Sequence, residues 1–244
     1  MATNPERTSS GLLQINVINI QNNFPIENAR ITISYKGEPT RPIEQVQTNS
    51  SGQTQQVTLP APPVEYSLEP SVIQPYSEYN LTVEAEGFQP MEISGTEILA
   101  DSTAIQPVAM TPEGGGRPVE DPVVIPDHTL YGNYPPKIAE SEIKPVNESG
   151  EIVLSRVVVP QTVVVHDGAP TDRTANDYYV PYRDYIKNVA SSEIYSTWPR
   201  SSITANVLAI MSFTLNRVYT EWYRNKGYNF TITSSTAYDH KWIY

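Results

Sequence analysis

The sequence predicts an α+β protein of several parts: an N-terminal antiparallel β-sandwich, a proline-rich linker, and a C-terminal α+β portion with two helices. Three observations predict this order. Apolar and polar residues alternate in short runs from residue 12 to 110, which is the period of half-buried strands. Prolines and glycines are then frequent over residues 113–150, where large apolar residues are few. After residue 180, apolar residues recur with a helical period.

The first part, residues 1–112, contains short alternating runs bounded by Pro, Gly, Asn and Ser, and no helical period interrupts them. Such runs are typical of antiparallel strands that bury one face. We expect strands at residues 13–20, 29–35, 55–59, 79–85, 91–96 and 104–110. Several short strands in succession predict a β-sandwich.

The second part, residues 113–150, carries the run EGGGRP and several further prolines. This composition predicts a linker. Its segment LYGNYPPKIAESEIKPV could lie as an extended strap on a neighbouring domain, because prolines favour the polyproline II conformation. Disorder is the alternative.

The third part, residues 151–244, begins with EIVLSRVVVPQTVVVHDG, which indicates two buried strands broken at Pro160. We expect one helix from Val180-Pro181 to about Tyr195. A second should run from Ile203 to about Arg224, capped by Ser201 or Ser202. Gly227 is a suitable stop, and the final residues return to strand or loop.

Composition narrows the classes of function. The chain of 244 residues has 16 basic and 27 acidic side chains, and its net charge of −11 argues against nucleic acid and anionic membranes as partners. No cysteine occurs, which excludes disulfides and thiolate zinc sites, and the three histidines are isolated. We therefore expect neither a metal nor a cofactor.

The N-terminus lacks the apolar stretch of a conventional signal peptide, and the apolar runs are far shorter than the roughly 20 residues that cross a bilayer.

Glu193 is the most informative residue of the predicted helices. It continues an apolar stripe of helical period formed by Tyr182, Ile186, Val189 and Ala190. A carboxylate on such a face either finds a cation or hydrogen-bond donors, or is desolvated until the protonated form is favoured. The sequence leaves both outcomes open: an ion pair with Arg183, Arg200 or Arg217, or a proton donor for acid-catalysed sugar chemistry. Asp184 faces another side of the helix and is expected to be a surface charge.

Two stretches carry resemblances. The strands in PIENARITIS and YNLTVEAEGFQPMEISG resemble the carboxypeptidase regulatory-like, transthyretin-like sandwich over about residues 10–112. The motif YIKNVASSEIYSTWP, followed by ANVLAIMSFTLNR, resembles the core of the stage II sporulation protein D family. Together with TLYGNYPPKI and LSRVVVPQTVVVHDG, it is similar to the clostridial spore cortex-lytic enzymes of SleC type.

This resemblance implies a lytic transglycosylase zymogen that cuts the glycan strand of spore cortex peptidoglycan during germination, with Glu193 as the catalytic acid and base. It implies a spore location and an N-terminal pre- and pro-segment removed by a germination protease near Leu154 to Gln161. Relatives continue beyond the position of Tyr244, so the chain is expected to be truncated. Some family members bind a metal through cysteine and histidine, and this chain has no cysteine.

Four further residues are candidates for substrate binding. Tyr195 and Trp198 lie close to Glu193 in the sequence and could stack on sugar rings. Asp239 and His240 precede the final aromatic segment and could line the cleft, with a loop surface as the alternative. A different class of function also stays open: a non-catalytic binding or inhibitory protein built on the sandwich, with an inactive truncated catalytic portion.

Overall fold

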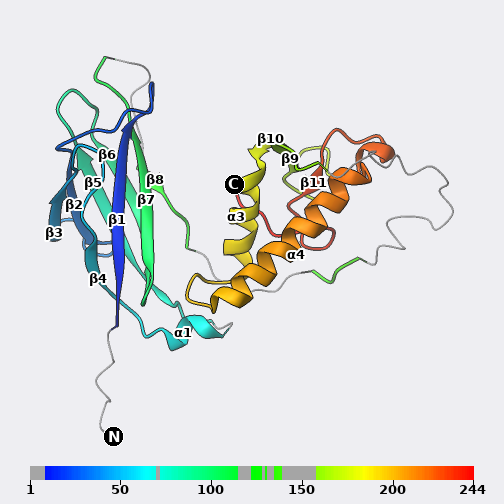
Figure 1. Ribbon diagram of the computed structural model, residues 1–244, viewed down its shortest axis with the longest axis horizontal. Helices are drawn as coiled ribbons and strands as arrows, with labels where there is room; N and C mark the ends of the chain where they lie inside the picture. The colour runs from blue at the N-terminus through cyan, green and yellow to red at the C-terminus, as the bar shows by residue number, and fades with distance from the viewer. Residues whose placement is uncertain (1–8, 70–71, 115–121, 128–129, 131–134, 139–157) are drawn as a thin grey trace, which may run out of the picture. The chain divides into compact units, whose positions relative to one another are not determined.

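The computed structural model describes residues 9–69, 72–114, 122–127, 130, 135–138 and 158–244. The chain divides into two compact units, Met1–Thr129 and Leu130–Tyr244 (Figure 1). The described residues form three β-sheets and three α-helices, which confirms the β-rich α+β class that the sequence predicts. Most of the predicted linker, and the Leu154–Val157 part of the predicted processing region, lie outside the described residues.

Unit 1 contains two sheets. The smaller has the strand order β4-β1-β7 and the larger the order β3-β2-β5-β6-β8. The strands are β1 (Ser9–Asn19), β2 (Arg30–Tyr35), β3 (Pro42–Gln47), β4 (Val57–Ala61), β5 (Tyr76–Glu84), β6 (Met91–Leu99), β7 (Thr103–Met110) and β8 (Val123–Val124), and a short helix α1 (Glu65–Leu68) follows β4.

The sandwich differs from the predicted one in pairing. β1 pairs with β7 in parallel, Leu12 opposite Thr103, so the all-antiparallel expectation is wrong there. β3 was not predicted, because its residues are mostly exposed and polar and show no alternation. β8 lies inside the predicted linker and adds to β6 in parallel.

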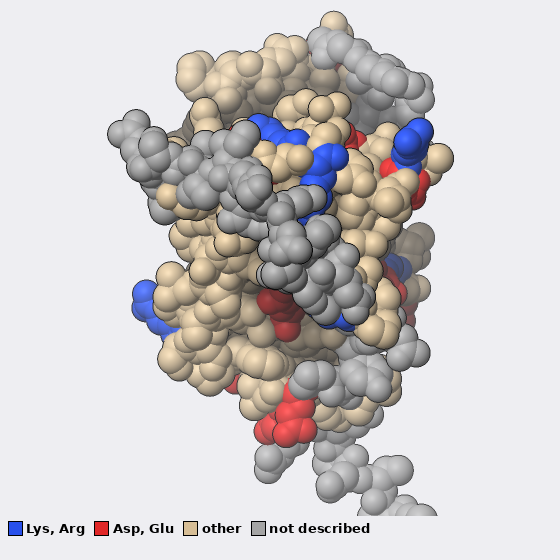
Figure 2. Space-filling model, turned by 90° about the vertical axis from the view of Figure 1, so that its right-hand side faces the viewer, with Lys and Arg blue, Asp and Glu red and all other residues tan. Residues whose placement is uncertain are grey.

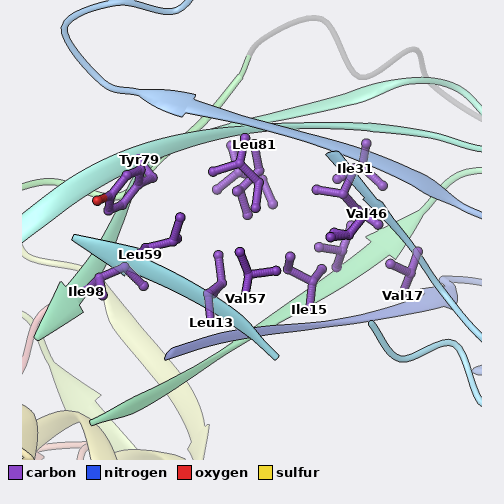
Figure 3. Packing of buried hydrophobic residues seen from close by; sticks show 14 of the residues in the cluster. Leu13, Ile15, Val17, Ile31, Val46, Val57, Leu59, Tyr79, Leu81 and Ile98 are labelled. Carbon is purple, nitrogen blue, oxygen red and sulfur yellow. The ribbon is translucent and has the colours of Figure 1, made fainter. Parts of the chain in front are cut away.

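Alternating side chains of the two sheets form the core of unit 1. Leu13, Ile15 and Val17 of β1 are fully buried and face side chains of β2 and β5, among them Ile31 and Leu81 (Figure 3). Tyr79 of β5 also lies in this core and donates a hydrogen bond from its hydroxyl to the Pro60 carbonyl of β4 at 2.6 Å. Burial raises the pKa of the Tyr79 hydroxyl, which keeps it a donor.

Unit 2 has a three-stranded sheet of order β10-β9-β11 and two long helices. Its elements are β9 (Thr162–His166), β10 (Asp177–Pro181), α3 (Tyr182–Glu193), α4 (Arg200–Tyr219), the 3₁₀ helix η1 (Arg224–Lys226) and β11 (Ile232–Thr233). Val163 and Val165 of the central strand pack with Tyr185, Val189 and Ile210 of the helices. None of the described helices is long and apolar enough to span a bilayer.

Both helices of unit 2 occur where the sequence predicts them, with different ends. α4 begins after Pro199, without a side-chain cap, so the prediction of a Ser201 or Ser202 cap is wrong. The proline fixes its own backbone angle and lacks an N–H, which suits the start of a helix. α4 ends at Tyr219, and Gly227 instead terminates η1 with a φ of 84°. A residue without a side chain adopts this left-handed conformation readily.

Candidate functional site

Glu193 is the last residue of α3. The stripe that leads to it is buried as predicted, since Tyr182, Ile186 and Val189 are 5%, 7% and 0% exposed. Glu193 itself is only half-buried, so the carboxyl lies at the edge of the interior. At the C-terminal end of a helix, the helix dipole disfavours a negative charge.

The carboxyl of Glu193 finds a neutral partner. Its Oε2 accepts a hydrogen bond from Asn206 Nδ2 at 2.7 Å. The alternative of an ion pair with arginine is not realised among the described residues: Arg217 pairs with Asp239, and Arg183 and Arg200 are exposed. Asn206 is not among the residues predicted for the site, although a polar residue between Ile203 and Ile210 on one face of α4 is a signal of the same kind as Glu193 on α3.

The two aromatic candidates differ in exposure. Tyr195 is 5% exposed, and its hydroxyl accepts a hydrogen bond from the Leu130 backbone N–H at 3.3 Å. Its ring therefore lacks the open face that stacking on a sugar requires, contrary to expectation. Trp198 is half-exposed in the turn between α3 and α4, where its backbone N–H donates a hydrogen bond to the Tyr195 carbonyl at 3.1 Å.

Asp239 lies in the interior and not in a cleft wall or on a loop surface. It is 3% exposed, and Oδ1 accepts a hydrogen bond from Arg217 Nε at 2.9 Å. Oδ2 accepts from Tyr223 Oη at 2.6 Å and from both the backbone N–H and the hydroxyl of Thr233, at 2.9 and 2.7 Å. Because both oxygens are engaged, Asp239 is built to join α4 to β11 and is not available to a ligand.

The cation of this buried pair is sandwiched by aromatic rings. The Arg217 guanidinium carbon lies 4.4 Å from the centre of the Phe213 ring and 4.3 Å from that of Trp222. Aromatic faces attract a cation, and most strongly when water is excluded. The charge of Arg217 is therefore stabilised by the Asp239 carboxylate and by two aromatic rings of unit 2.

His240 is partly buried beside the same cluster. Its Nδ1 lies 3.3 Å from the Tyr185 hydroxyl, and its ring centre lies 4.6 Å from that of Phe213. The pKa of His240 is lowered to about 4, chiefly by burial; the charge of Asp239 opposes this shift, and the cations Lys137 and Arg217 contribute to it. The side chain is thus neutral near pH 7 and packs as part of the core rather than as a charged ligand.

This shift predicts a pH dependence for unit 2. The unfolded chain binds a proton at His240 near the ordinary pKa of 6.5, while the folded unit resists it down to about pH 4. Stability is therefore fully present above about pH 6.5 and declines by about 2–3 kcal/mol as the pH falls through this window. Urea unfolding followed by tryptophan fluorescence reports this unit, because all three tryptophans, Trp198, Trp222 and Trp242, lie in it.

The matched variant is His240→Gln, which retains a polar side chain without a titrating proton. We expect a shallower decline in the free energy of unfolding between pH 6.5 and 4 for this variant. Equal declines in the two proteins would contradict a depressed His240 titration.

Each unit has a hollow lined by described residues. In unit 2, a cavity of about 150 Å³ is lined by residues near the end of α4, including Arg217, Tyr223 and Arg224. Asn206 and Arg217 are separated by about 16 Å along the helix axis, so this cavity is separate from the Glu193 carboxyl. In unit 1, an open groove of about 930 Å³ is lined by Asn22, Phe24, Arg30 and Glu84 among others.

No cluster of His, Cys, Asp and Glu suited to a metal ion occurs within the described ranges. On the face drawn in Figure 2, the acidic and basic side chains form small separate groups rather than a continuous strip of one sign. The candidate site consists of Glu193 and its partner Asn206, with Trp198 in the turn that follows α3.

No family model matches the sequence, and no curated protein matches it either. Solved structures with some similarity include the Bacillus anthracis TIE protein, with 15% identity and a TM-score of 0.29 over 43% of this chain and 17% of that one. Klebsiella pneumoniae 5-hydroxyisourate hydrolase has 18% identity and a TM-score of 0.29 over 43% of this chain and 92% of its own. The minor pilin GBS52 of Streptococcus agalactiae has 12% identity and a TM-score of 0.30, covering 50% and 49%. The chain thus spans 17% of the TIE protein and about half of the pilin, and these similarities assign it to no family.

Proposed function

We propose that this chain belongs to a spore cortex-lytic enzyme in its zymogen form, and that it cuts the glycan strand of cortex peptidoglycan as a lytic transglycosylase through Glu193. The observation that carries the proposal is the setting of Glu193: a half-buried carboxyl at the end of a buried helical stripe, bound by a neutral amide and, among the described residues, by no cation. The resemblance of YIKNVASSEIYSTWP to the sporulation protein motif supports the same residue.

The chemistry requires one carboxyl group. Protonated Glu193 gives its proton to the glycosidic oxygen as the bond from that oxygen to the sugar C1 breaks. The resulting carboxylate then takes the proton of the muramic 6-hydroxyl, whose oxygen closes an anhydro ring on C1. No water is consumed, so the second carboxylate of a hydrolase is unnecessary. Asp184 fits this account, since it is exposed and paired with Lys187 at 3.1 Å in the first turn of α3.

The other partners follow from the same proposal. Trp198, half-exposed in the turn five residues after Glu193, would contact a sugar ring. The activating protease of the spore would cut near Leu154 to Gln161, where Val158 and Val159 are 48% and 56% exposed. Incubation with a germination protease should cleave the chain between Gly150 and Thr162, and an uncut chain would remove this step.

A second candidate is a non-catalytic protein that binds glycan through the sandwich. The open groove of unit 1 favours it, because Phe24 is 68% exposed there beside the polar side chains of Asn22, Arg30 and Glu84. Sugars are commonly held by an aromatic face with polar groups around it. This candidate needs no contribution from Glu193.

Purified spore cortex separates the two candidates. The full-length, protease-activated protein should release soluble muropeptides from cortex, measured by chromatography of the supernatant. If the protein instead sediments with cortex and releases nothing, and Phe24→Ala abolishes that sedimentation, the binding protein is the correct class and the transglycosylase proposal fails.

A further inference from the structure

We propose that Asn206 is a positioning residue that holds the Glu193 carboxyl in both of its protonation states. The inference rests on the proposed function, in which Glu193 gives up and regains a proton. It begins with the geometry: the amide nitrogen of Asn206, on α4, donates to Glu193 Oε2, on α3, at 2.7 Å. The two helices therefore fix the carboxyl from opposite sides of the turn that contains Trp198.

The second observation concerns the other end of the same amide. Asn206 Oδ1 is buried, and none of the described residues donates a hydrogen bond to it. A buried acceptor without a donor is unfavourable, so its presence calls for a reason. A protonated Glu193 carries one O–H donor, and could donate it to Oδ1 once the amide turns that atom toward the carboxyl.

A half-turn of the amide exchanges these two arrangements. With Glu193 ionised, Nδ2 donates to the carboxylate. With Glu193 protonated, Oδ1 accepts from the acid O–H. The same side chain therefore bonds to the acid before proton donation and to the carboxylate after it. The amide loses no hydrogen bond to Glu193 at either stage.

The alternatives to asparagine at this position would each favour one state. An arginine would stabilise the carboxylate strongly and oppose protonation, while an apolar residue would leave the carboxylate without its donor. A neutral amide gives the carboxylate a donor without the strong stabilisation that a cation would give it. Asn206 is half-buried and lies on the same face of α4 as the half-buried Ile203 and the buried Ile210.

The test uses three variants and two readouts. Asn206→Leu removes both hydrogen-bonding groups, and Asn206→Asp keeps the shape but replaces the donor by a second carboxyl. Asn216→Leu changes an exposed asparagine of the same helix and serves as the control. The first readout is the carbon-13 titration of the Glu193 carboxyl in the substrate-free chain. The second is the pH profile of kcat for cortex cleavage by the full-length protein.

For Asn206→Leu, we expect the Glu193 titration midpoint to rise by about one pH unit, because the ionised form loses its donor. A rise is also expected for Asn206→Asp, because two carboxyls share the site, and this variant covers the case that the leucine variant fails to fold. Asn216→Leu should match the parent. In the active protein, kcat should fall about tenfold with KM nearly unchanged, and the alkaline limb of the profile should move upward with the titration.

The two proposals fail in different ways. If neither Asn206 variant moves the Glu193 titration or the pH profile, the positioning role is overturned even if Glu193 is catalytic. If the midpoint moves as expected but the parent releases no muropeptides, the contact is correct and the proposed function is not.

Discussion

Replacing Glu193 by glutamine should lower the release of muropeptides from cortex by about a thousandfold, within the range by which a general acid and base contributes to catalysis. Glutamine has the shape of glutamate but cannot transfer a proton. Its side-chain carbonyl can still accept the hydrogen bond that Asn206 now donates at 2.7 Å. The variant should therefore fold like the parent, with an unchanged urea midpoint, while the rate of release falls.

The control is Asp184→Asn on the same helix. Asp184 is exposed and bound only to Lys187 within the described part of the chain, so its substitution should leave the rate within a factor of two. A Glu193→Gln protein that releases muropeptides at the parental rate would remove Glu193 from the chemistry. Loss of activity in both variants would indicate that helix α3, and not the carboxyl, is responsible.

Replacing Asp239 by asparagine should destabilise unit 2 by about 3–5 kcal/mol, which is the usual cost of removing one partner of a buried ion pair. The side chains of Arg217 and Asp239 are 1% and 0% exposed, so the remaining guanidinium would be a buried charge without its carboxylate. The amide nitrogen would also face hydroxyl and N–H groups that now donate to the carboxylate. Urea unfolding monitored by tryptophan fluorescence measures this loss directly.

A double variant distinguishes charge from shape. Arg217→Met combined with Asp239→Asn removes the buried cation as well, and should recover part of the lost stability. Recovery should be incomplete, because Arg217 also stacks on Phe213 and Trp222. If Asp239→Asn alone costs less than about 1 kcal/mol, the network around Asp239 does not hold unit 2 together as described.

The parts of the fold that depend on local patterns could be predicted from the sequence. β1, β2 and β7 were found from alternation, and α3 and α4 from their helical period. Which strands pair, and in which direction, could not be predicted from local patterns, because the parallel pairing of β1 with β7 joins segments far apart in the chain. β3 was missed because an exposed, polar strand at the edge of a sheet carries no apolar period.

The candidate site shows the same division. Glu193 could be singled out because one polar residue interrupted an apolar stripe, and Asn206 carried the same signal on α4 without being read. The burial of Asp239 could not be predicted, since its cation, Arg217, comes from a helix and its other donors from separate segments. A charged residue in a predicted loop can therefore be fully buried when the fold supplies an oppositely charged partner.

The most direct test of the account is cortex digestion by the full-length, protease-activated protein in water enriched in oxygen-18, followed by mass spectrometry of the released fragments. If Glu193 alone moves the proton and the muramic 6-hydroxyl closes the ring, the new ends are anhydro sugars that carry no oxygen-18. New reducing ends labelled with oxygen-18 would mean that water is the nucleophile, and would contradict the single-carboxyl mechanism.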